Sequence, residues 1–273
     1  MPDDPTPSPG APSPGGRLLV EQDGDALVAR IANEARANAL DEPILDDLVS
    51  LLEGPRVAGA RVVLLAGAGD RHFSAGLDLG ERTADELAAF LQAGERRLGR
   101  AARAIAECPV PVIGVLNGAA FGGALELAIA CDWRIVRRGA QMGMPAARLG
   151  VVYAADGLRR FVAAMGPART RRLFLTGTPV EADEAVAIGL VDEVVAEDEL
   201  WPTALAAARA VASGAPLAIA GTRAIIAAMT ERAPWEEVEA TATQARARAF
   251  ASDDFSEGLA AFRDRRPPQF GGR

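Results

Sequence analysis

The longest uncharged run of the chain, residues 108–125, constrains the fold more than any other segment. The run is nearly long enough to span a membrane, but two prolines, an asparagine and four glycines would interrupt a continuous helix. Val112–Leu116 has the unbroken apolar pattern of a buried strand, and the paired glycines Gly122 and Gly123 then open an apolar helix. The run therefore predicts a strand, a tight turn and a helix.

Glu126 falls in the first turn of that predicted helix. A helix start presents unpaired N–H groups and a partial positive charge, which suit a developing oxyanion. Gly123 and Glu126 are three residues apart, so one helical turn can set a backbone donor and a carboxylate beside the same substrate carbon. This arrangement predicts a site that makes and protonates an enolate.

A second glycine-rich turn follows the predicted strand at 62–66. Gly76 would let the backbone turn sharply and aim the N–H of Leu77 inward. Amides from two separate turns, those of Leu77 and Gly123, would then hold one carbonyl oxygen. We expect this pair to form an oxyanion hole.

Both turns resemble those of the enoyl-CoA hydratase/isomerase, or crotonase, superfamily. The motifs are FSAGLD at 73–78 and NGAAFGGALE at 117–126, and the resemblance extends over roughly residues 18–273. It implies an α/β crotonase (ClpP/crotonase-like) fold of repeated β-β-α units with a C-terminal helical extension. It also implies acyl-CoA thioester substrates in fatty acid metabolism, no separate cofactor or metal, and homotrimers that often pair into hexamers.

The same resemblance suggests residues that hold the substrate and its CoA. A basic residue usually precedes the stretch at 37–40, and a basic residue of the tail often reaches the nucleotide. For Asp78 a turn-capping role is an alternative, and for the arginines solvation is one. The candidates are Arg36, Ala37, Ala75, Gly76, Asp78, Gly122, Pro145, Ala146 and Arg265.

The reaction depends on Ala146, which occupies the position where hydratases of this family carry a second glutamate. Water addition uses one group for the water and another for the Cα proton. The stretch Pro145 to Tyr153 instead resembles methylmalonyl-CoA decarboxylases, although those enzymes have histidine at the position of Leu77. Loss of CO₂ creates the enolate without a base, and the phenol of Tyr153 can bind the leaving carboxylate or deliver a proton.

The sequence therefore favours an acyl-CoA lyase that decarboxylates its substrate, with Glu126 as acid/base and Tyr153 as an auxiliary. Hydration by Glu126 alone is the first alternative, and a non-catalytic acyl-CoA-binding protein is the second. A serine hydrolase built on His72 and Ser74 is disfavoured, because no G-x-S-x-G elbow surrounds this serine.

Composition agrees with an enzyme that has one substantial core, since 49% of the 273 residues are hydrophobic. The net charge of −8 argues against nucleic acid as a partner. No membrane partner is expected. Cys108 and Cys131 lie in apolar surroundings, which fits buried thiols in a reducing cytoplasm.

We divide the chain into a disordered tail (1–16), a crotonase core (17–200) and a C-terminal helical region for trimerisation or lid formation (201–273). The tail is rich in Pro, Gly and Ser, which disfavours a packed structure. Within the core we expect a hairpin at 18–20 and 27–31, strands at 62–66, 112–116 and 133–136, and helices at 42–52, 84–106 and 123–130. Further helices are expected at 182–188, 199–213, 217–229 and 235–251.

Overall fold

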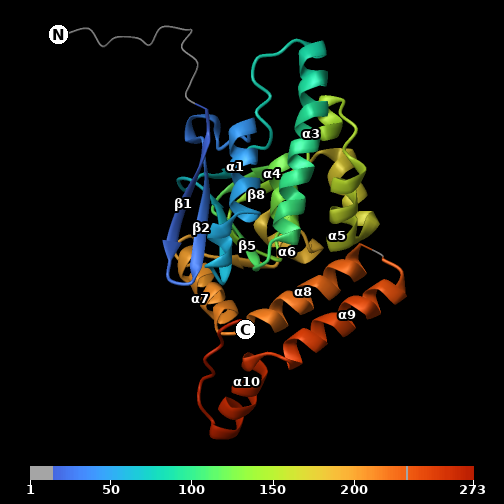
Figure 1. Cartoon of the computed structure of the whole chain (residues 1–273). Coiled ribbons are helices and arrows are strands. Elements are labelled where there is room, and N and C mark those ends of the chain that lie inside the picture. The colour runs from blue at the N-terminus through green and yellow to red at the C-terminus, as the bar shows by residue number, and fades with distance from the viewer. Residues whose placement is uncertain (1–14, 232) are drawn as a thin grey trace, which may run out of the picture.

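Two β-sheets form the centre of the structure, a computed structural model that describes residues 15–231 and 233–273 (Figure 1). The larger sheet has the strand order β1-β2-β3-β5-β7-β10, in which only β1 and β2 are antiparallel. The smaller sheet has the order β4-β6-β8-β9. The larger sheet consists of Arg17–Asp23 (β1), Ala26–Ala32 (β2), Val62–Gly67 (β3), Val112–Leu116 (β5), Trp133–Arg137 (β7) and Glu193–Val195 (β10), and the smaller of His72–Ser74 (β4), Ala119–Phe121 (β6), Gln141–Gly143 (β8) and Val180–Glu181 (β9).

Three successive segments of the chain each give one strand to each sheet and then form a helix. β3 and β4 lead to α3 (Ala84–Glu107), β5 and β6 lead to α4 (Gly123–Ala130), and β7 and β8 lead to α5 (Ala155–Thr176). This repetition confirms the expected α/β fold of β-β-α units. Because β3 and β5 are parallel neighbours, the turns that follow them leave from the same edge of the sheet.

Helices cover both faces of the larger sheet. Along β3, Val63 and Leu65 face the cluster that holds α1 (Glu42–Leu52), α3 and α4, whereas Val62 and Leu64 face the cluster that holds α7 (Leu200–Ala212). The alternation follows from the two-residue period of a strand. The remaining helical segments are η1 (Glu34–Arg36), α2 (Pro55–Ala58), η2 (Ala146–Leu149), α6 (Ala182–Ile188), α8 (Pro216–Thr230), α9 (Trp235–Phe250) and α10 (Asp253–Asp264).

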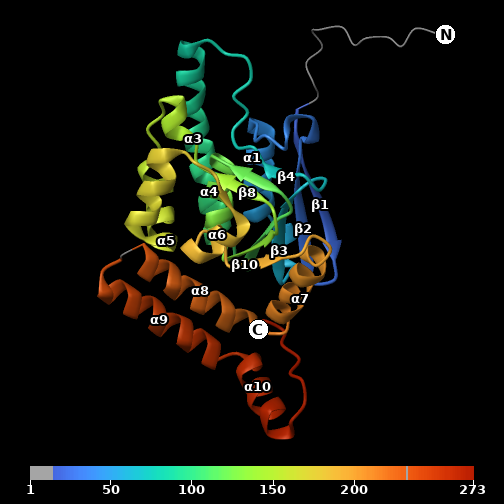
Figure 2. The same cartoon turned by 180° about the vertical axis from the view of Figure 1, so that it is seen from behind.

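α7, which the expected division assigns almost entirely to the C-terminal helical region, lies against the core. It packs on the larger sheet through Leu200, Ala204 and Ala208, and the division of the chain at residue 200 stays a prediction. Alanines on one face of α7 let it lie close to the strands. α8 and α9 form a pair of helices beyond the core, and α10 lies farther out, as both views show (Figures 1 and 2).

No single helix of the described chain has the length and apolar composition needed to cross a membrane. α7 and α8 meet those two criteria only when taken together, and a bend of 105° separates them.

Most of the expected elements are confirmed, but the helices α5 and α10, the strand β10 and all four strands of the smaller sheet were missed. α5 contains Gly166, with φ of +77°, followed by Pro167, and this kink breaks the helical pattern in the sequence. The expected tail lies outside the described residues except for Gly15 and Gly16. The Gly16 amide donates a hydrogen bond to the Asp41 carboxylate at 2.5 Å.

Candidate active site

The turn after β4 presents the amide of Leu77. Gly76 has φ of +90°, a backbone conformation that favours glycine. The Leu40 amide donates to the Gly76 carbonyl at 2.7 Å, and the Asp78 amide donates to the Leu40 carbonyl at 2.9 Å. In such a parallel bridge the amide of Leu77 points away from Leu40. It donates no hydrogen bond to any residue that the structure describes.

Gly122 and Gly123 form the start of α4. Gly122 has φ of +54° and ψ of −124°, and its amide donates to the Gly143 carbonyl at 3.0 Å. Gly123 is the first residue of the helix, so its N–H has no acceptor within the helix. No acceptor for it is found elsewhere in residues 15–231 and 233–273. The positive end of α4 thus carries a second unpaired amide.

The two turns touch through their backbones. A Cβ atom placed on Gly76 would lie 2.6 Å from the Phe121 carbonyl oxygen and 3.2 Å from the Gly123 nitrogen. Only glycine allows this approach, because a side chain would clash with backbone atoms. The structure therefore brings the Leu77 and Gly123 turns together, as two donors to one oxygen would require. Their role as an oxyanion hole stays a prediction.

Two buried asparagines hold the loops behind these turns. Asn38 donates to the carbonyls of Ala68 and His72, both at 2.9 Å. Asn117 accepts from the Gly67 amide at 2.9 Å and donates to the Gly69 carbonyl at 2.8 Å. Buried amide side chains with satisfied partners fix loop positions that few apolar contacts could define. We did not identify these residues from sequence as supports, although an asparagine before a glycine turn is a usable signal.

Glu126 lies in the first turn of α4 and is only 3% exposed. The Tyr153 hydroxyl donates to its Oε2 at 2.6 Å, and the Arg160 guanidinium lies 3.3 Å from its Oε1. Burial raises the pKa of Glu126 above its usual value of 4.5, while the Tyr153 hydrogen bond and the Arg160 charge oppose the rise. Glu126 therefore keeps its proton to a higher pH than an ordinary glutamate, as a proton donor requires.

Gly157 makes the contact between Glu126 and Tyr153 possible. A Cβ atom on Gly157 would lie 2.6 Å from the Tyr153 ring and 2.9 Å from Glu126 Oε2. Burial raises the pKa of Tyr153 well above its usual value, and the charge of Glu126 raises it further. The phenol thus stays protonated and donates to the carboxylate. Its ring also packs edge-on against Phe174, with centroids 5.4 Å apart.

The segment at 145–153 contains no carboxylate, as the sequence already shows. Pro145 is the residue before η2, and Ala146, the first residue of η2, is 8% exposed. The Ala146 carbonyl accepts from the Val151 amide at 2.9 Å, which folds the segment back toward Tyr153. At position 146 the side chain is therefore a buried methyl group.

Most of the candidate CoA-binding residues lie together beside the Leu77 turn. Arg36 forms an ion pair with Asp78, and its side chain is half exposed. Ala37 has φ of +53°, and its carbonyl accepts from the Ala75 amide at 3.0 Å. Arg265, in contrast, follows α10, which lies at the opposite end of the molecule from the start of α3 (Figure 1). One chain alone does not bring Arg265 to the site.

Ser74 and His72 form no nucleophile–base pair in the described chain. Ser74 is fully buried, and its hydroxyl oxygen accepts a hydrogen bond from the Gly76 amide at 3.2 Å. No hydrogen bond joins its hydroxyl to the His72 ring among residues 15–231 and 233–273. The serine therefore supports the turn, and the geometry gives no support to a serine hydrolase.

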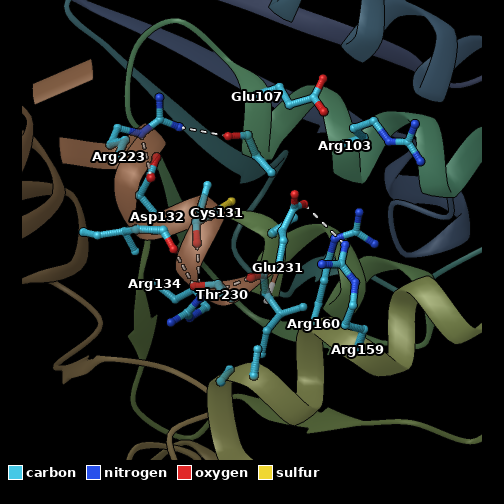
Figure 3. A pocket seen from close by; sticks show the side chains of 17 residues that line it. Arg103, Glu107, Cys131, Asp132, Arg134, Arg159, Arg160, Arg223, Thr230 and Glu231 are labelled. Carbon is cyan, nitrogen blue, oxygen red and sulfur yellow. Dashed lines mark hydrogen bonds and ion pairs between the residues drawn. The ribbon is translucent and has the colours of Figure 1, made fainter. Parts of the chain in front are cut away.

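A cavity of about 840 Å³ lies at the other end of α4, away from Gly123 (Figure 3). Its lining includes Asp132 and Arg223, which pair at 2.7 Å, and Arg159 and Glu231, which lie 3.4 Å apart. Arg160 also lines it, so the arginine that contacts Glu126 borders this cavity as well. No sequence signal pointed to Arg160, because α5 itself was missed.

Comparison with known proteins gives concordant matches over nearly the whole chain. The family model described as enoyl-CoA hydratase/isomerase matches residues 23–273. An enoyl-CoA isomerase/hydratase of Zymoseptoria tritici is 32% identical over 269 residues, covering 92% of this chain and 85% of the relative. A carnitinyl-CoA dehydratase of Salmonella paratyphi A is 32% identical over 257 residues, covering 91% of this chain and 90% of the relative.

A crystal structure of an enoyl-CoA hydratase from Bacillus anthracis superimposes on the chain with a TM-score of 0.86 at 29% identity. The superposition covers 94% of this chain and 100% of that chain.

Proposed function

Because the chain belongs to the enoyl-CoA hydratase/isomerase, or crotonase, family, which acts on acyl-CoA, we propose that it adds water reversibly to an enoyl-CoA thioester. The carrying observation is the pair of unpaired amides, of Leu77 and Gly123, beside the buried carboxyl of Glu126. A thioester oxygen between these amides gains negative charge as the water oxygen bonds to Cβ. Fixed donors in a dry site stabilise that charge strongly.

In this proposal Glu126 delivers the proton to Cα. Its raised pKa keeps the proton available, and its place one helical turn from Gly123 sets it beside the carbon next to the held carbonyl. Tyr153 acts on Glu126 and not on the substrate, since its hydroxyl is engaged with the carboxylate at 2.6 Å. This engagement leaves the phenol poorly placed to bind a leaving carboxylate, as the decarboxylase hypothesis required.

Decarboxylation remains a second candidate, favoured by the methyl group of Ala146 where a second glutamate would stand. The bond between Cα and the substrate carboxylate would break, its electron pair would enter the enolate, and CO₂ would leave. Glu126 would then protonate Cα. A site without a carboxylate at 146 would repel such a substrate less.

CoA, as part of the substrate, is proposed to lie along the exposed edge formed by Arg36 and Asp78, with the backbone at Ala37, Ala75 and Gly76. The arginine is half exposed and close to the turn that presents Leu77. The proposed chemistry draws on no separate cofactor. A cytoplasmic location is part of the proposal, since Cys108 and Cys131 are buried free thiols.

Assembly into a homotrimer, or a dimer of trimers, is proposed because α8 to α10 leave large apolar side chains uncovered. α8 has no buried residue of its own. Further copies of this chain would cover this surface and would let Arg265 approach the CoA of a neighbouring copy. The exposed side chains are those of Ile226, Met229, Trp235, Phe250, Phe255, Leu259 and Phe262. Sedimentation equilibrium checks this assembly, and a monomer at micromolar concentration would contradict it.

Parallel assays of crotonyl-CoA and methylmalonyl-CoA test the proposed reaction. We expect hydration of crotonyl-CoA and a loss of about 10²–10⁴-fold in kcat for Glu126→Gln, the usual contribution of a general acid. If methylmalonyl-CoA is turned over faster than crotonyl-CoA, the reaction is decarboxylation and not hydration. If the wild type and Glu126→Gln both bound the thioesters and neither turned any of them over, the chain would be an acyl-CoA-binding protein.

A further inference from the structure

Addition of water calls for a second carboxylate, which the segment at Ala146 does not supply. On the proposed function, this carboxylate must come from another segment of the chain. α3 is the candidate, because it runs between α1 on one side and α5 on the other, as both views show (Figures 1 and 2).

The salt bridges of α3 fix which side of the helix faces α1. Arg97 pairs with Glu42 at 2.9 Å and lies 3.9 Å from Asp46, and both carboxylates belong to α1. Glu95 precedes Arg97 by two residues, which is about 200° around a helix. Glu95 therefore projects from the side of α3 opposite α1, where α4 and α5 lie.

Glu95 is also at the level of the two donor turns. A Cβ atom on Gly94, the preceding residue, would lie 3.3 Å from the Leu77 side chain. Leu98, one turn later, packs on Gly123, where an added Cβ would lie 2.9 Å from its Cδ2. Glu95 lies between these contacts in the helix, so its backbone is held beside both proposed oxyanion donors.

The charge of Glu95 acts on the residues of the site. Burial is the largest cause of the raised pKa of Glu126, and the charges of Asp156 and Glu95 add to it. The pKa of Tyr153 is likewise raised first by burial and then by Glu126, with a further contribution from Glu95. Glu95 is thus electrostatically coupled to both residues.

The Glu95 carboxylate is half-buried, and within residues 15–231 and 233–273 no ion pair or hydrogen bond holds it. Arg97 and Arg100 of the same helix are engaged elsewhere, since Arg97 pairs with α1 and Arg100 pairs with Glu53 at 3.1 Å, while Arg96 is exposed and forms no ion pair with Glu95. An acidic side chain facing a site, without a cationic partner, is available to accept a proton.

We infer that Glu95 is the second catalytic carboxylate, supplied by α3 in place of the position that Ala146 occupies. Glu95 takes a proton from the attacking water as the water oxygen bonds to Cβ. The π electrons move onto the thioester oxygen, between the Leu77 and Gly123 amides. The enolate then takes the Glu126 proton at Cα, and solvent exchange returns a proton from Glu95 to Glu126, so the atoms and charges balance.

The test compares Glu95→Gln with Glu107→Gln in the full-length protein. Glu107 is the last residue of the same helix and is exposed, so Glu107→Gln removes the same charge from α3 outside the site. With crotonyl-CoA we expect Glu95→Gln to lower kcat by about 10²–10⁴-fold and to change KM less than about threefold. Glu107→Gln should keep kcat within about twofold of the wild type.

A second measurement is independent of turnover. Removing the Glu95 charge should lower the pKa of Glu126, because that charge raises it. Infrared difference spectra over a pH series report the protonated carboxyl band of Glu126, which Glu126→Gln identifies by its loss. Glu107→Gln should leave this titration unchanged.

The outcomes separate this inference from the proposed function. If the wild type hydrates crotonyl-CoA and Glu95→Gln keeps its kcat, Glu95 is not catalytic while the proposed function stands. An unmoved Glu126 titration in Glu95→Gln would remove the claimed coupling. If the wild type hydrates no enoyl-CoA, the proposed function fails first, and the role of Glu95 as a base for water fails with it.

Discussion

Gly76→Ala tests the close approach of the two donor turns. The new methyl carbon would lie 2.6 Å from the Phe121 carbonyl oxygen, whereas a carbon–oxygen contact needs about 3.3 Å, so the turns must separate by roughly 0.7 Å. The φ of +90° adds a backbone cost of about 1–3 kcal/mol. A displacement near 1 Å at a site of this kind lowers kcat about 10²-fold.

The assay follows turnover of the thioester that the wild type uses fastest, together with the thermal unfolding midpoint. We expect kcat to fall about 10²-fold, and Tm to fall by about 2–4 °C for each kcal/mol lost. Gly139→Ala is the matched control, because Gly139 has φ of +79° and no atom within 4 Å of an added Cβ. It should lose stability through its backbone conformation and keep its kcat.

The reasoning is refuted if Gly76→Ala and Gly139→Ala lose similar stability and both keep kcat within about threefold of the wild type. The strain of a positive φ would then explain everything, and the contact with Phe121 would not set the position of the Leu77 amide.

Three further predictions concern the group around Glu126. Gly157→Ala should lower kcat at least tenfold, because its methyl group would push Tyr153 and Glu126 apart. The higher helix propensity of alanine should stabilise α5 by up to about 1 kcal/mol. Unchanged kinetics beside a raised Tm would contradict the expected loss of kcat. Tyr153→Phe keeps the ring packed on Phe174 but removes a hydrogen bond that lowers the pKa of Glu126. The limb of the pH–rate profile that Glu126 sets should therefore move to higher pH. An unmoved limb would count against the assignment of Glu126 as the proton donor. Since the folded-state pKa of Glu126 is raised above 4.5, its contribution to stability is fully present below that pH and is lost as pH rises through the raised pKa. Glu126→Gln should therefore gain stability relative to the wild type as pH rises from 4.5 to neutrality, and calorimetric Tm curves that stay parallel would disprove this linkage.

The sequence was informative wherever structure is decided locally. The runs at 62–66 and 112–116 predict buried strands because every side chain is apolar, and Glu42–Leu52 predicts a helix by its period. α5 escaped this reasoning, because Gly166 and Pro167 interrupt the helical pattern that flanks them. Because α5 was missed, Arg160 could not be placed beside Glu126 from the sequence.

The surface that α7 packs on could not be derived from the sequence for a related reason. α7 is a helix in either assignment, and its composition alone does not say which surface its alanines meet. Only the packing of Leu200 and Ala204 on the larger sheet decides that it belongs to the core.

What the sequence determined by itself is the local chemistry of the site: glycines at 76 and 122, where the backbone takes positive φ, and a carboxylate in the first turn of an apolar helix. Those properties depend on a few adjacent residues and their allowed dihedral angles. The tertiary structure decided that Gly76 touches Phe121 and that Tyr153 reaches Glu126 across 27 positions of sequence. Contacts between distant residues depend on how parallel strands and their helices pack, and no local pattern encodes that packing.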